Sequence, residues 1–154
     1  MGDIGWIDLE AAFEGCQNLV TFKGAIPSSV TTLKEFFRDT INLTNLNFSG
    51  SNTIGVTSLE RMFQGATGIT TVDLSSFNTS NVTALSSMFS GTTRLKNVNL
   101  TSFDTSQVTD TSGMFLDAIS IEEIDLSSFD TTNVDSMFQM FRNASSLLLS
   151  LIHI

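Results

Sequence analysis

The chain has 154 residues, with 7 Lys and Arg against 16 Asp and Glu, and its formal net charge is −9. This length is typical of a single domain, and the negative charge disfavours nucleic acid or an anionic membrane surface as the main partner. The single Cys and the single His cannot form an internal disulfide or the usual zinc sites.

A repeat of 26 residues organises the chain. Six phenylalanines set its register with spacings of 24, 26, 26, 26 and 26 residues: Phe13, Phe37, Phe63, Phe89, Phe115 and Phe141. We predict one repeat domain over residues 1–147, with about five units of 26 residues. Residues 148–154 are out of register, and we interpret their end, LSLIHI, as a non-native tail. Because the chain opens inside a repeat, we expect a fragment of a longer array.

In each unit the first pattern is that of a strand. Ile69, Val72 and Leu74 follow the spacing L-x-x-V-x-L, which places Val72 and Leu74 on one face. The same spacing predicts parallel pairing of strands near 45–48, 71–74, 97–100 and 123–126. It also predicts that Asn97 and Asn99 are exposed while Val98 and Leu100 are buried.

The second pattern in each unit is that of a short helix. Val82, Leu85, Met88 and Phe89 form one helical stripe. Directly after the Val column come the expected N-caps: Thr31, Thr57, Thr83, Thr109 and Asp135. Thr57 with Glu60 predicts a capping box. The expected helix ends carry residues that tolerate a left-handed conformation: Gly15, Asp39, Gly65, Gly91, Asp117 and Asn143. Together the two patterns predict a right-handed α/β solenoid of strand plus short helix units, with a parallel sheet on one face.

The unit LKNVNLTSFDTSQVTDTSGMF, residues 95–115, resembles the bacterial-surface 26-residue repeat of the BspA-like leucine-rich-repeat proteins. Its sister units beginning at Ile69 and Ile121 fit equally well. The resemblance implies a secreted or surface-anchored protein, with extracellular or cell-surface localisation, whose repeats bind host or neighbouring-cell macromolecules. It implies no shared catalytic residue, so we predict that the chain is not an enzyme.

We predict non-enzymatic binding of a protein or glycan at a cell surface or in the extracellular matrix, without a cofactor. We expect neither nucleic-acid binding nor membrane insertion. The predicted binding face is the polar side of the strands: Asn45, Asn47, Thr71, Asp73, Asn97, Asn99, Glu123 and Asp125. The alternative function is that of a structural spacer, which would extend a distal domain from the surface.

Stacked carboxylates leave two minor alternatives open. Asp104 and Asp130 share one turn column, so they could form a glycosidase pair or hold Ca²⁺. We favour a structural role, in which such side chains accept hydrogen bonds within a repeated turn. Cys16 shares a column with small residues and is expected to be buried. Phe138 departs from its column, where we favour local packing over an exposed contact surface.

Overall fold

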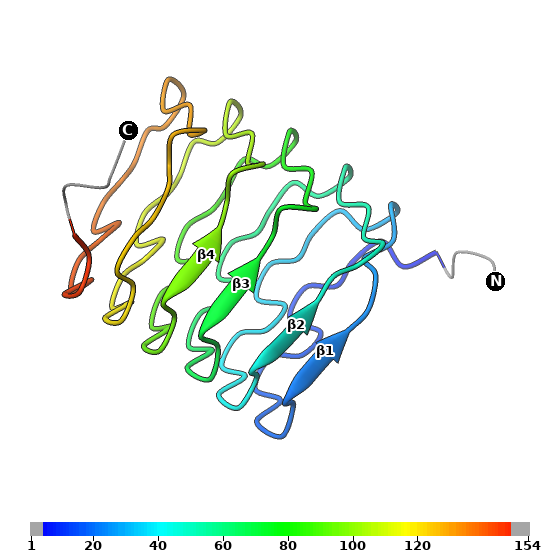
Figure 1. Ribbon diagram of the computed structural model, residues 1–154. Coiled ribbons are helices and arrows are strands. Elements are labelled where there is room, and N and C mark those ends of the chain that lie inside the picture. Colours follow the sequence, from blue (N-terminus) through cyan, green and yellow to red (C-terminus); the bar gives the residue numbers. More distant parts are fainter. Residues whose placement is uncertain (1–4, 149–154) are drawn as a thin grey trace.

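In the computed structural model, which describes residues 5–148, the chain winds through successive coils that lie side by side in sequence order (Figure 1). One side carries short strands, β1 (Thr21–Lys23), β2 (Asn45–Asn47), β3 (Thr71–Asp73) and β4 (Asn97–Asn99). The other side of each coil is a six-residue turn segment, as in residues 34–39, 60–65 and 86–91.

The strands pair in parallel but not continuously. β1 pairs with β2 and β3 pairs with β4, whereas β2 and β3 belong to separate two-stranded sheets. The predicted pairing of 71–74 with 97–100 is therefore confirmed, and the predicted pairing of 45–48 with 71–74 is wrong. No strand forms at 123–126 within the described residues. Beside this segment, one backbone hydrogen bond joins neighbouring coils: Leu148 N donates to Glu122 O at 3.1 Å.

The strand side is thus bonded in pairs of coils. Thr44 N donates to Val20 O and Lys96 N donates to Thr70 O, while no such bond joins residues 44 and 70 or residues 96 and 122 in the described chain. We attribute the alternation to coil spacing. The stacked phenylalanine rings of successive coils lie 5.4 to 5.7 Å apart. Hydrogen-bonded strands lie about 4.8 Å apart, so pairs of strands close and the excess width collects at every second junction.

The predicted short helices are absent between residues 5 and 148. In each turn segment the N–H groups alternate between two acceptors. Phe36 N and Arg38 N donate to carbonyls three residues earlier, whereas Glu35 N, Phe37 N and Asp39 N donate to the following coil. An α-helix would direct all of these groups along its own axis. Bonds between coils therefore replace the helical pattern.

This alternation requires two left-handed residues in each turn segment. The six predicted positions that include Gly65 and Asp117 do have positive φ, from 56 to 70°. A second column that the helix prediction missed has φ between 53 and 60°: Ala11, Glu35, Arg61, Ser87, Gly113 and Gln139. The predicted N-caps are wrong as well. The Thr57 hydroxyl donates to Thr31 O at 3.1 Å across the coil junction, so it forms no capping box with Glu60.

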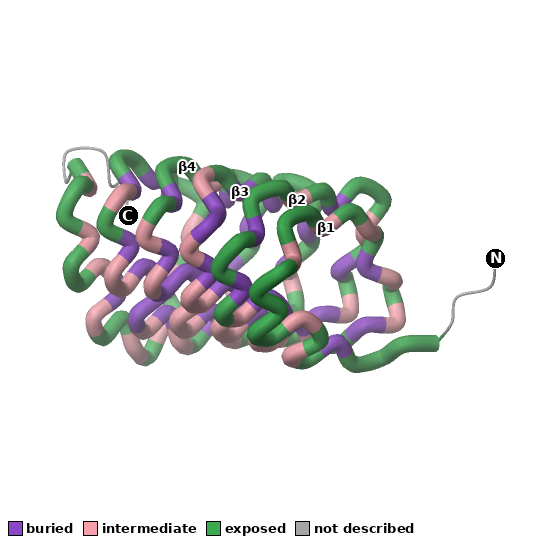
Figure 2. The backbone as a smooth tube through the Cα atoms, turned by 90° about the horizontal axis from the view of Figure 1, so that it is seen from below, coloured by how far each residue is buried: buried purple, intermediate pink, exposed green. Residues whose placement is uncertain are grey.

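The core lies between the two sides, and buried residues recur in every coil (Figure 2). Val98 is half-buried and Leu100 is buried, while Asn97 and Asn99 are exposed, which confirms the predicted strand register. Phe63, Phe89 and Phe115 are fully buried in one parallel stack, with interplanar angles of 7° between neighbours.

Two side chains of the end coils contradict the expectations. Cys16 is exposed, because the first coil has no earlier described coil against it. Phe138 is 69% exposed, so the preference for local packing is wrong at this position. Most of the predicted tail, residues 149–154, lies outside the described residues.

Candidate functional site

The predicted binding face is brought together on the strand side. Strand residues alternate in direction, so Asn45 and Asn47 on β2, Thr71 and Asp73 on β3, and Asn97 and Asn99 on β4 are all exposed. Glu123 and Asp125 are exposed as well, but they lie on a segment without strand structure. The face is therefore regular over three strands and irregular beyond them.

A groove runs over β2, β3 and β4, and part of it lies over the open junction between β2 and β3. Its main part has a volume of about 460 Å³ and is lined by residues 44–46, 71–73 and 97–99. A second part of about 300 Å³ shares Leu46 and Asp73 with the first and continues to Ser49 and Ser76. The second part thus lies where the sheet is not hydrogen-bonded across, whereas the main part also covers the bonded pair of β3 and β4. Sequence reasoning missed it because the strand pattern predicts one continuous sheet.

The polar side chains of this face are held by local turns. Asp73 Oδ1 accepts a hydrogen bond from Ser75 N at 3.0 Å, and Asn99 Oδ1 accepts one from Thr101 N at 3.2 Å. The hydrogen bonds from Ser75, together with a weaker one from Asn99, lower the pKa of the Asp73 carboxyl. Asp73 is therefore the fixed negative charge of a groove whose polar lining consists otherwise of hydroxyl and amide groups, beside apolar residues such as Leu46 and Val98.

The carboxylates that suggested chemistry serve the same type of turn. Asp104 Oδ1 accepts from Ser106 N at 3.0 Å, and Asp130 Oδ1 accepts from Thr132 N at 2.9 Å. Hydrogen bonds from Ser106 lower the pKa of Asp104, and the neighbouring Asp130 charge opposes this only weakly. These contacts agree with the structural role favoured for both residues. Within residues 5–148, no group of three His, Cys, Asp or Glu side chains is arranged to hold a metal ion.

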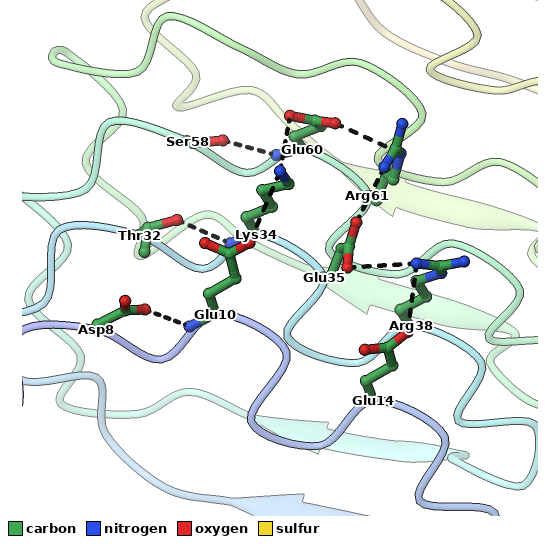
Figure 3. Close-up of polar contacts among 10 residues, drawn as sticks. All are labelled: Asp8, Glu10, Glu14, Thr32, Lys34, Glu35, Arg38, Ser58, Glu60 and Arg61. Atoms are coloured by element: carbon green, nitrogen blue, oxygen red, sulfur yellow. Dashed lines mark hydrogen bonds and ion pairs between the residues drawn. The ribbon is translucent and has the colours of Figure 1, made fainter.

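A network of ion pairs crosses the first three coils on the turn side (Figure 3). Lys34 Nζ lies 3.7 Å from Glu10 and 3.8 Å from Glu60, one coil away on either side. Burial of Glu35 opposes its ionisation, but the hydrogen bond from Arg61 at 3.0 Å and the Arg38 charge lower its pKa overall. Sequence reasoning missed this network. The alternation of Glu10, Lys34 and Glu60 at the repeat spacing was the available signal.

Most basic residues of the first three coils are paired with acidic ones, whereas the later coils hold few basic residues. Lys34, Arg38 and Arg61 are all engaged with carboxylates of the first three coils. Residues 97–141 contain no Lys or Arg but eight acidic residues: Asp104, Asp110, Asp117, Glu122, Glu123, Asp125, Asp130 and Asp135. The later coils therefore carry most of the net negative charge: residues 66–154 hold 9 acidic and 3 basic residues, which is −6 of the total of −9. Residues 5–148 form no helix that is long and apolar enough to cross a membrane.

Comparison with known proteins gives one family and one fold. A family model described as "Mycoplasma protein of unknown function, DUF285" matches residues 7–100 and 70–152. A leucine-rich repeat protein from Eubacterium ventriosum, known from its crystal structure, is similar with a TM-score of 0.58 and 19% identity over 86% of this chain. The match covers 32% of that protein, so this chain spans about a third of its length. No curated protein matches the chain. Together these similarities confirm the resemblance to the BspA-like leucine-rich-repeat proteins.

Proposed function

Because the chain belongs to the family described as Mycoplasma protein of unknown function, DUF285, and has a leucine-rich-repeat fold, we propose that it is a non-enzymatic binding module. Its partner would be a protein or a glycan at a cell surface or in the extracellular matrix, and the module itself would be located there. The proposed binding site is the polar strand face with the groove over β2, β3 and β4.

The groove carries this proposal. It gathers exposed hydroxyl, amide and carboxylate groups from three strands into one continuous hollow. A purely structural spacer needs no such hollow, because its outer surface has only to remain soluble. The face lacks an exposed aromatic side chain among residues 44–49, 71–76 and 97–99, so binding energy would be shared by many weak polar contacts.

The ordered turns favour binding over catalysis. Ser106 and Thr132 lower the pKa of Asp104 and Asp130 through side-chain and backbone hydrogen bonds, and Ser75 lowers that of Asp73 through backbone and side-chain bonds. A carboxyl group that must donate a proton near neutral pH needs a raised pKa. These three carboxylates therefore act as fixed acceptors, and glycan cleavage is the weaker alternative.

The test is retention of surface-derived glycans and matrix proteins by the immobilised chain. Thr71→Arg fills the groove at an exposed position and should abolish retention. Asn97→Ala should reduce it only slightly, because the contacts are distributed. Ser86→Arg, on the turn side, introduces the same side chain away from the face and should bind as wild type does.

Charge on the face is tested separately. Glu123→Lys combined with Asp125→Lys should weaken a basic partner and lower the salt sensitivity of its binding. If wild type retains nothing, or if Thr71→Arg binds as wild type does, the binding proposal fails and the spacer becomes the better account.

A further inference from the structure

Main-chain groups of β2 and β3 meet the groove at the open junction. The residues on either side of Leu46 form the backbone bonds from β2 to β1, so the N–H and C=O groups of Leu46 point towards β3. In the same way, Thr71 and Asp73 alternate with the residues that bond to β4, so their main-chain groups point towards β2. No backbone hydrogen bond joins these two edges within residues 5–148. Both edges line the groove, which therefore offers main-chain donors and acceptors to a ligand.

Two side chains in the groove are also free to bind. The Thr71 hydroxyl and the Asn97 carboxamide form no side-chain hydrogen bond with any described residue, and both are exposed in the main part of the groove. A hydroxyl group and a carboxamide group can each donate and accept hydrogen bonds. The two residues are direct partners in the register of β3 with β4, so one ligand can reach both.

Asp73 and Asn99 form a fixed pair in the same groove. Asp73 Oδ1 accepts a hydrogen bond from Ser75 N at 3.0 Å, and the Asn99 side chain donates to the Asp73 carboxylate. Asn99 is itself held, because its Oδ1 accepts bonds from Thr101 N at 3.2 Å and from the Thr101 hydroxyl at 2.8 Å. A carboxylate has about four acceptor sites and a carboxamide has two N–H donors, so both members of the pair keep capacity for a ligand.

We propose that the ligand of this groove is an uncharged oligosaccharide, held through vicinal hydroxyl groups by Asp73 and Asn99. This inference rests on the proposed function, because it names the ligand class of the same site. One sugar hydroxyl donates to the Asp73 carboxylate, and its neighbour accepts a hydrogen bond from the second N–H of the Asn99 amide. Ring C–H groups contact Leu46 and Val98, which are half-buried and line the groove.

The size and the charge of the groove support this choice. Its main volume of about 460 Å³ lies within the range of about 300–1,000 Å³ that is typical of small-ligand sites. Asp73 is the one ionisable side chain among the described residues that line the groove, and the whole chain has a net charge of −9. An anionic glycan is therefore repelled, and a basic peptide finds a single charge to pair with. An uncharged sugar can use every donor and acceptor of the lining.

The first test measures the binding of 1,4-linked tetrasaccharides of mannose, galactose and glucose by isothermal titration calorimetry. At least one of them should bind, and more tightly than its monosaccharide, because a longer chain reaches polar groups on more strands. Its affinity should be the same at low and high salt, since the ligand has no charge. Periodate cleaves the bond between carbons that carry vicinal hydroxyls, so the same tetrasaccharide should no longer bind after periodate oxidation and borohydride reduction.

Variants of the groove test the role of the carboxylate. Asp73→Asn should weaken sugar binding at least about tenfold, because a hydrogen bond to a charged acceptor is stronger than one to a neutral acceptor. The fold should be kept, since Asn47 and Asn99 accept the same turn bond at the equivalent positions of β2 and β4. Asp104→Asn makes the same change in a turn outside the groove and should bind as wild type does.

A basic partner is tested with the same sugars. Glu123→Lys combined with Asp125→Lys removes charge that a basic partner would need, and it should leave sugar binding unchanged. Equal sugar binding by wild type and Asp73→Asn would overturn the proposal. An equal loss of binding for Asp104→Asn and Asp73→Asn would overturn it as well.

The second test separates a sugar ligand from a protein ligand. Surface and matrix extracts are treated with either periodate or protease before they are passed over the immobilised chain. Retention should be lost after periodate, should persist after protease, and should be reduced by Asp73→Asn. The reverse pattern would identify a protein partner, which would overturn the sugar proposal and leave the proposed binding function intact. If the chain retains nothing from untreated extracts and binds none of the tetrasaccharides, both proposals fail.

Discussion

Replacement of Phe89 by Ala tests whether the ring stack stabilises the fold. Phe89 is fully buried and lies between Phe63, at 5.5 Å, and Phe115, at 5.4 Å, with both neighbours nearly parallel to it. Truncating a buried Phe to Ala costs about 3–5 kcal/mol through lost burial and the remaining cavity. Each aromatic pair contributes about 0.5–1.5 kcal/mol beyond burial, so we expect the loss at Phe89 to lie near the upper end of that range.

The assay is urea unfolding followed by far-UV circular dichroism, with two matched variants. Phe138→Ala makes the same truncation at a side chain that is 69% exposed, and it should change the free energy of unfolding by less than about 0.5 kcal/mol. Phe89→Leu keeps most of the volume and loses the ring, so it should cost less than Phe89→Ala. A loss below about 1 kcal/mol for Phe89→Ala, or an equal loss for Phe138→Ala, would refute the reasoning, since stability would then not depend on the stack.

Three further predictions concern backbone spacing, carboxylates and cations. Gly68→Ala should destabilise the fold by about 1–3 kcal/mol, because its Cβ would lie 2.6 Å from Leu43 O and 2.7 Å from Ile41 O. Gly91→Ala, whose Cβ would make only ordinary van der Waals contact with Gly65 at 3.7 Å, should cost about 1 kcal/mol in the same unfolding assay because of its φ of 70°. Because its neighbours lower the pKa of Glu35 below the ordinary 4.5, its contribution is present above pH 4.5 and is lost as pH falls through the lower folded value. The unfolding free energy of wild type should therefore fall with acidification in that window by up to about 1 kcal/mol more than that of Glu35→Gln, and equal pH profiles would contradict this. Millimolar Ca²⁺ should leave the melting temperature unchanged. If these turns bound Ca²⁺, an ion concentration of 100 times the dissociation constant would add about 2.7 kcal/mol to the free energy of unfolding. A rise in melting temperature that is abolished by Asp104→Asn with Asp130→Asn would show that these turns bind the ion.

The sequence predicts those features that depend on side-chain periodicity. Alternation at Asn97, Val98 and Asn99 correctly predicts which residues face solvent, because strand geometry fixes that choice. The left-handed positions at Gly65 and Asp117 are also predicted, since few residue types tolerate them. The polar strand face follows directly from these two regularities.

The features that depend on the spacing of coils are not predictable in this way. The apolar stripe of Val82, Leu85 and Met88 fits a helix, but it fits equally a turn segment whose alternate N–H groups bond to the next coil. The second left-handed column could not be predicted from residue type, because Glu, Arg and Ser, which occupy it at Glu35, Arg61 and Ser87, seldom adopt this conformation. We attribute the open junction between β2 and β3 to a mismatch of less than about 1 Å per coil, which no residue pattern expresses.

Because hydrogen-bonded and open strand junctions alternate, the repeat unit of the sequence differs from the repeat unit of the backbone bonding. In sequence the unit is one coil of 26 residues, whereas in backbone bonding on the strand side it is two coils. Gain or loss of two coils would keep every strand with a partner and would preserve the position of the grooves. Gain or loss of one coil would leave a strand unpaired or shift the open junction to different side chains. Changes in repeat number by one and by two are therefore not equivalent, even though the turn side would accept either.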